Sequence, residues 1–155
     1  MRDISGPYDG ILQGLTDRLR TLLRVMDRQD RLETASAFVG WLDGEVAAGR
    51  PPDAARELLL RALRVAGDAL NYRILGALDP DEGLGVAALM PKTGLDRVAL
   101  SERVNDLVQV GLAAWDPVGE EVRATPLATG LRALVEMVAR RAGDRLGEEL
   151  RNRPA

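Results

Sequence analysis

The sequence contains no cysteine and no histidine among its 155 residues. Disulfides, thiolate metal sites and cysteine nucleophiles are therefore excluded. The side chain that proteins use most often as a general base and as a transition-metal ligand is also missing. Any catalysis would have to rest on carboxylates, lysine or hydroxyl groups. We therefore expect a protein that is not an enzyme and that holds no metal or cofactor.

Aromatic side chains are scarce as well, with one Phe, two Tyr and two Trp. Leu, Ala and Val carry most of the apolar fraction, which favours a core of packed helices. No segment approaches the roughly 18 uncharged apolar residues that span a bilayer, and the opening MRDISGPYDG has an acid where a signal peptide is basic. We expect a cytoplasmic protein with no membrane partner.

Lysine is nearly absent, since Lys92 is the single Lys among 21 cationic residues. The arginines fit either phosphate recognition or a GC-rich coding bias. The net charge of −3 gives the whole chain no attraction for nucleic acid or anionic membranes.

Residues 1–50 carry apolar side chains spaced by threes and fours, which predicts one long helix or a helical hairpin. This segment is expected to sense a signal, to dimerise or to complete the core. Its first stripe consists of Tyr8, Ile11, Leu12, Leu15, Leu19, Leu22, Leu23 and Met26, and its second of Leu32, Ala35, Phe38, Val39, Leu42 and Val46.

From residue 51 onward the pattern predicts helices interrupted by one β-hairpin. Two prolines start a helix expected over 51–78, and the DPDEG run after it is a turn, because it lacks the further oxygen ligands of a calcium loop. A short helix over 86–90 is closed by the residues up to Gly94. The remaining elements are a helix from Leu95 to Val110 with Leu95, Leu100, Val104 and Leu107 buried, extended runs over 112–115 and 121–125, and a helix from Pro126 to the polar tail.

Three runs in this order resemble bacterial regulators of the ArsR and MarR type. Residues 64–78 are similar to the "ALGDPxRxRILxxL" helix of ArsR relatives, residues 93–112 keep the "TGLSxxxVSxxLxxLxxxGLV" register, and residues 123–130 resemble "YxLTPxG". The resemblance covers roughly residues 60–132. It implies a mainly α fold with a small β-hairpin wing, in which a winged helix-turn-helix over 51–130 carries helical extensions at 1–50 and 131–155.

The resemblance also implies a function, that of a homodimeric transcription repressor that binds double-stranded DNA. The helix Leu95–Val110 would enter the major groove, with Lys92 and Arg123 near phosphates. The residues expected to face the groove are Thr93, Arg97, Val98, Ala99, Ser101, Glu102 and Arg103.

The charge of this region departs from the expected pattern. Between Gly85 and Thr125 there are four basic and six acidic side chains, and phosphate neutralisation supplies most nonspecific DNA affinity. One alternative is that a dimer recruits arginines of the last helix, which otherwise form a solvated face. The other is a protein-interaction or assembly module in which Val98 and Ala99 meet a partner. The recruitable cations are Arg132, Arg140, Arg141, Arg145, Arg151 and Arg153.

Two further expectations concern partners. Phe38, Trp41 and Tyr72 either gather at a pocket for a small effector or belong to the core. Two apolar stripes exceed what a small winged domain buries, so either one pairs with a second copy or both pack within the chain. The stripes are Ile11, Leu15, Leu19, Leu22 and Met26, and Leu131, Leu134 or Val135, Val138 and Ala142.

The sequence also gives no sign of a phosphate-binding glycine loop, because Gly83 and Gly85 complete neither a GxGxxG motif nor a P-loop.

Overall fold

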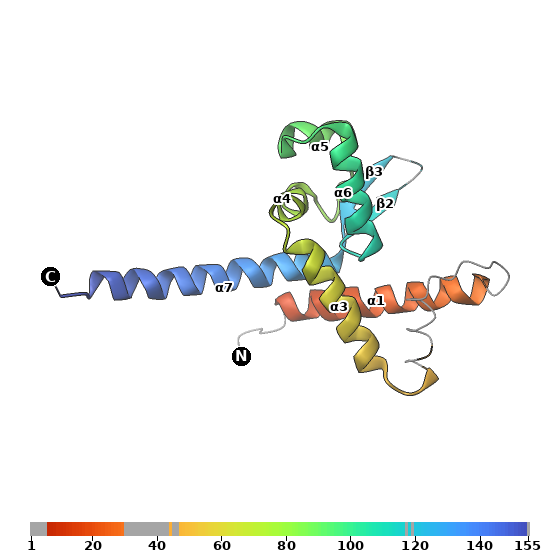
Figure 1. Ribbon diagram of the computed structural model, residues 1–155, viewed down its shortest axis with the longest axis horizontal. Helices are drawn as coiled ribbons and strands as arrows, with labels where there is room; N and C mark the ends of the chain where they lie inside the picture. The colour runs from red at the N-terminus through yellow and green to blue at the C-terminus, as the bar shows by residue number, and fades with distance from the viewer. Residues whose placement is uncertain (1–5, 30–43, 45–46, 117, 119, 155) are drawn as a thin grey trace.

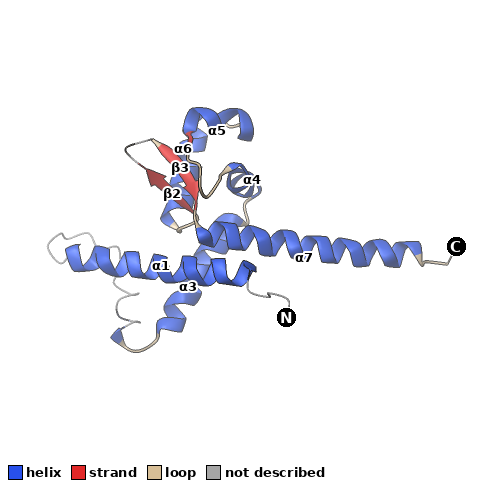
Figure 2. Ribbon diagram, turned by 180° about the vertical axis from the view of Figure 1, so that it is seen from behind, coloured by secondary structure: helices blue, strands red, loops and turns tan. Residues whose placement is uncertain are grey.

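The computed structural model describes residues 6–29, 44, 47–116, 118 and 120–154. This part of the chain is mainly helical and has one small antiparallel sheet, as expected (Figure 1, Figure 2). Phe38 and Trp41, and the side chains of Leu22 and Met26, lie outside the described part. In chain order the elements are α1 (Gly6–Gln29), α3 (Pro51–Ala66), α4 (Ala69–Ala77), β1 (Leu84–Gly85), α5 (Val86–Thr93), α6 (Arg97–Gln109), β2 (Ala113–Asp116), β3 (Glu121–Ala124) and α7 (Pro126–Arg151).

The two terminal helices, α1 and α7, lie side by side with their chains antiparallel (Figure 1). Glycines on α1 make the close approach possible. A Cβ added to Gly14 would lie 2.5 Å from the backbone nitrogen of Leu127, and one added to Gly10 would lie 3.4 Å from the Cα of Gly130. Any larger side chain at Gly14 would push the helices apart.

The helix expected over residues 51–78 is two helices. α3 ends at Ala66, and α4 begins after Asp68, whose carboxylate accepts hydrogen bonds from the backbone N–H groups of Leu70 (2.9 Å) and Asn71 (3.1 Å). Asp68 is thus an N-cap, which satisfies donors that a continuous helix would have paired internally. The prediction of one helix was wrong because it treated Gly67 and Asp68 as helix interior.

The next two helices have bounds close to the expected ones. α5 includes Pro91 and continues to Thr93, and Gly94, with a φ of 72°, ends it in the left-handed conformation. α6 begins after Asp96, whose side chain accepts from the N–H of Ala99 at 2.8 Å. Gly111, with a φ of 80°, follows α6 in the conformation that favours glycine after a helix.

The sheet has three strands in the order β1, β3, β2, all antiparallel. β2 and β3 form the expected hairpin, with Trp115 opposite Val122. The sequence did not predict β1, in which Leu84 also pairs with Val122, from the other side. The strand connects the turn after α4 to the first residue of α5.

One buried cluster joins the described helices to the sheet. It includes Ile11 and Leu15, so the described part of the N-terminal segment contributes to the same core as the later helices. Burial along α7 ends at Leu131. None of the described helices is long and apolar enough to cross a membrane. The largest fully buried side chains are Ile74, Leu75, Leu89, Leu100, Leu107, Leu112, Val122 and Leu127.

Candidate nucleic-acid interface

α6 is held by its apolar face and presents a polar face to solvent. Leu100, Val104 and Leu107 are buried, as the spacing predicted, whereas Leu95 lies before the helix and is half-buried. Four of the residues expected to face a groove, Arg97, Val98, Ser101 and Glu102, are exposed, and Ala99 is half-buried. The exposed face therefore holds one cation and one anion in its first two turns.

The residues before α6 divide between surface and core. Lys92 is exposed on the last turn of α5. Thr93 is only 2% exposed, and its hydroxyl donates to the carbonyl of Leu89 at 2.9 Å. The expectation that Thr93 faces DNA is therefore wrong, because its side chain is buried and its hydroxyl bonds within α5.

Arg103 does not face outward either. Its Nη1 donates to Asp68 Oδ1 at 2.7 Å and to Asn71 Oδ1 at 3.0 Å, which ties α6 to the first turn of α4. The backbone N–H of Asn71 lowers the pKa of Asp68 most, and the Leu70 N–H and the Arg103 guanidinium lower it further. The sequence missed this contact because the partners are 35 residues apart in the chain. Arg103 positions α6 rather than extending from it.

The hairpin carries Arg123 among acids. Its guanidinium donates to the carbonyl of Asp81 at 3.0 Å and lies 3.7 Å from the carboxylate of Glu121. Asp116 accepts from the N–H of Val118 at 3.0 Å, and Glu120 is exposed. Arg123 remains at the surface, but part of its charge is already balanced within the chain.

The acidic turn before β1 is built by backbone hydrogen bonds. The Asp79 carboxylate accepts from the N–H groups of Glu82 (2.9 Å) and Asp81 (2.7 Å), and these two bonds lower its pKa. Its carbonyl accepts from the N–H of Ala124, which fastens the turn to β3. Within the described ranges, no group of three or more acidic side chains is arranged to hold a metal ion.

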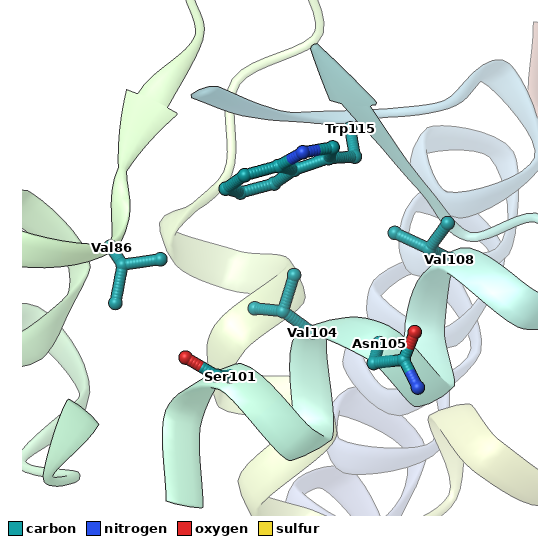
Figure 3. Close-up of a pocket in the computed structure, with 6 residues that line it drawn as sticks. All are labelled: Val86, Ser101, Val104, Asn105, Val108 and Trp115. Atoms are coloured by element: carbon teal, nitrogen blue, oxygen red, sulfur yellow. The ribbon is translucent and has the colours of Figure 1, made fainter. Parts of the chain in front are cut away.

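A pocket of about 360 Å³ lies between α6 and the hairpin (Figure 3). The Trp115 ring stands on β2 over Val104, with Val86 at one side and the polar groups of Ser101 and Asn105 at the rim. Trp115 is 41% exposed. The sequence predicted that Trp115 ends an extended run over 112–115, but it gave no indication that α6 would lie beside this side chain.

Tyr72 lies at a different place, between α4 and α7. Its hydroxyl donates to Glu136 Oε1 at 2.7 Å, and the guanidinium of Arg132 is 5.9 Å from its ring. Burial raises the pKa of Tyr72 most, and the Glu136 carboxylate raises it further. A groove of about 330 Å³ beside the ring includes Leu63 and Val135. The proposed gathering with Phe38 and Trp41 lies outside the described residues.

The arginines of the last helix are not beside α6. Arg132 is engaged with Tyr72, and the others on α7 lie on its second half, which extends away from α5 and α6 in both views (Figure 1, Figure 2). Within one copy of the chain, these cations therefore cannot offset the acids of α6 and the hairpin. They are Arg140, Arg141, Arg145 and Arg151.

Comparison of the chain with protein-family models, with curated proteins and with solved structures found no match.

Proposed function

We propose that α4 to β3 form a winged helix-turn-helix and that the chain is a DNA-binding transcription regulator. The support is the order helix, strand, helix, helix, strand, strand, with β3 paired between β1 and β2. In such an arrangement a supporting helix and a short helix present the next helix to the major groove, and the hairpin lies against the backbone. α6 would be the recognition helix.

The observation that carries the proposal is the pair of exposed polar side chains at the start of α6. Arg97 and Ser101 are one helical turn apart, and Lys92 is exposed on the preceding helix. An arginine here can donate two hydrogen bonds to a guanine, the serine can bond a base or a phosphate, and the lysine neutralises a phosphate. The partly balanced Arg123 would touch backbone from the hairpin.

The acidic surroundings set the expected strength of this interaction. Glu102 and Asp106 are exposed on α6 itself, and Glu120 is exposed at the hairpin tip. We expect this surface to neutralise few phosphates, so its affinity for DNA should depend weakly on salt. Each phosphate contact changes the slope of log K against log salt by about −1. A dimer doubles the contacts and supplies two α6 helices to a palindromic site, where binding would repress by occlusion.

The experiment is an anisotropy titration of the purified protein against its upstream intergenic DNA and a scrambled duplex at low and near-physiological salt. Lys92→Ala should weaken binding to both duplexes and lower the salt slope by about 0.9 for each copy of Lys92 that contacts a phosphate. Arg97→Ala should reduce discrimination by about 10-fold or more, the loss of one bidentate base contact. Equal binding of both duplexes by the unmodified protein would contradict the proposal.

The matched control is Arg56→Ala, which removes one exposed cation from α3, where its guanidinium contacts Asp53 at 2.8 Å. Binding by this variant should equal that of the unmodified protein. A loss as large as that of Arg97→Ala would mean that total charge, rather than the α6 surface, controls affinity.

A second function, binding of a protein partner, is favoured by the pocket under Trp115. Its apolar floor is bordered by Ser101 and Asn105, and Glu102 and Asp106 are exposed on the same helix. A half-exposed Trp beside a pocket is typical of interface hot spots. The surface suits a basic segment with one apolar anchor. Labelled basic peptides with one Leu or Phe should bind the protein but not its Trp115→Ala variant. If the protein is a DNA regulator without a protein partner, these peptides should bind neither the protein nor the variant.

A further inference from the structure

The middle of the exposed face of α6 holds no cation. Val98, Glu102 and Asn105 follow each other at intervals of four and three, the spacing of one helix face, and all three are exposed. We call these three residues the central row. They lie opposite the buried residues of the helix, so this row is the part of α6 that points most directly away from the protein core.

The other polar residues of α6 lie on either side of the central row. Arg97 and Ser101 form a neighbouring row on the side of the hairpin, where Ser101 borders the pocket under Trp115. Arg103 lies on the other side and is bound to α4. Asp106, the remaining charged residue of the helix, lies between the central row and Arg103 around the helix. The central row itself therefore presents one apolar group, one carboxylate and one carboxamide.

These three side chains are not engaged by the fold. Within the part of the chain that the structure describes, the Glu102 carboxylate and the Asn105 carboxamide have no hydrogen-bond or ion-pair partner. Val98 is 69% exposed. A valine at such a position packs against nothing and favours a helix less than most residues do, so it adds no stability to a surface that is only solvated. The central row has the composition of a binding surface.

We propose that the central row recognises a cytosine in the major groove, with Glu102 as the specificity-determining residue. The inference rests on the proposed DNA-binding function. Cytosine presents an amino donor, N4, beside the apolar edge at C5. The Glu102 carboxylate accepts from N4, and Val98, one turn earlier on the same face, contacts the C5 edge. Asn105 lies one turn further along the groove, where its carboxamide pairs with an adenine.

The carboxylate also discriminates against the other bases. Guanine presents O6 and N7 and thymine presents O4, all of them acceptors, so an anion beside them loses its water without gaining a donor. Adenine has a donor, N6, but it lies between two acceptors of the A·T pair. Glu102 thus lowers affinity for most sequences and spares those with a cytosine at one place, which is how repulsion produces specificity.

The first test selects duplexes from a random library with the full-length protein and sequences the bound fraction. The unmodified protein should enrich sites with one fixed C·G pair. Glu102→Gln should change the preference at that position from C·G to A·T, because a carboxamide pairs with adenine. Its binding to a scrambled duplex should strengthen, since a negative charge leaves the interface. An undiminished C·G preference in this variant would overturn the inference.

The matched control is Glu120→Gln, which removes the same charge from the exposed tip of the hairpin. This variant should also bind the scrambled duplex more tightly, but it should keep the C·G preference. Loss of that preference here as well would overturn the role of Glu102. The two proposals fail differently: no enrichment by the unmodified protein would overturn DNA recognition altogether, whereas enrichment that Glu102→Gln leaves unchanged would overturn only the assignment to the central row.

A second test places Val98 against the base. 5-Methylcytosine at the selected position adds one methyl group beside this side chain, so anisotropy titration should show about 2–4-fold tighter binding. Val98→Ala should lose most of this gain, and Glu102→Gln should weaken binding to both duplexes by at least about 5-fold. An equal effect of the methyl group on the unmodified protein and on Val98→Ala would overturn the contact with C5. Circular dichroism of each variant verifies that it is folded.

Discussion

The Arg103 guanidinium lies 2.7 Å from the carboxylate of Asp68, the residue that caps α4. One carboxylate therefore serves two elements: it accepts the first free N–H groups of α4 and holds the middle of α6. The orientation of α6 against its supporting helix depends on this polar contact as well as on the apolar residues beneath it.

Arg103→Ala should destabilise the fold, whereas Arg97→Ala should not. The first change removes hydrogen bonds to Asp68 and Asn71, and the second removes an exposed side chain. We expect Arg103→Ala to lower Tm by about 2–5 °C and Arg97→Ala to leave it within about 1 °C. Differential scanning calorimetry measures both. Equal Tm values for the two variants would show that the Arg103 contacts contribute nothing to stability.

Acid should destabilise the protein through Asp68 and Asp79. Hydrogen bonds in the fold lower the pKa of both side chains. As pH falls, the unfolded chain therefore binds more protons than the folded chain. The stabilisation is therefore complete well above about pH 4, the pKa of an unfolded aspartate, and is lost as pH falls through and below it. Urea unfolding at steps from pH 7 to pH 3 should show this decline.

Asn substitutions isolate the charge in that experiment. Asp68→Asn and Asp79→Asn keep an acceptor oxygen for the same backbone N–H groups but no longer titrate. Each variant should lose less stability than the unmodified protein between about pH 5 and pH 3, and the combined variant should lose least. An unchanged decline in the combined variant would assign acid sensitivity to other groups.

Gly14→Ala should destabilise the protein although alanine favours helices. The new Cβ would meet the backbone of Leu127 at 2.5 Å, so α1 and α7 must separate. We expect a net loss of about 1–3 kcal/mol in unfolding free energy. Gly147→Ala is the control, because nothing lies within 4 Å of a Cβ there, and it should gain up to about 1 kcal/mol. Chemical denaturation of both variants gives the comparison.

Arg18→Met should loosen the end of α6. Arg18 reaches from α1 and donates to the carbonyl of Gln109, the last residue of α6, where a cation also complements the helix dipole. Burial lowers the pKa of Arg18, and its Nε has no hydrogen-bond partner in the part of the chain that the structure describes. We expect a net loss of about 1 kcal/mol and faster amide exchange in the last turn of α6. Unchanged exchange there would refute the capping role.

Local patterns predicted much of the fold. The spacing of Leu100, Val104 and Leu107 identified the buried face of α6, and the left-handed glycine at Gly111 marked its end. The hairpin followed from its turn residues. These features were accessible because each depends on neighbours within about one or two turns of the chain.

Most of the errors concern features that depend on distant residues. The break at Asp68 is the exception, since the Gly67-Asp68 pair was a local signal that the prediction treated as helix interior. Arg103 seemed to be exposed because its partners belong to another helix. β1 is two residues long, too short for any periodicity. The Trp115 pocket requires β2 to lie beside α6, which no local pattern contains.

The contact between Gly14 and Leu127 also has a kinetic consequence. The two residues are more than a hundred positions apart, so the main surface against which α1 packs is missing until α7 has been synthesised, although α1 also contacts α3. During translation the side of α1 that packs on α7 stays uncovered while the central elements fold, and closing so long a loop is slow. The newly made chain is therefore most vulnerable to aggregation and proteolysis just before its last helix emerges.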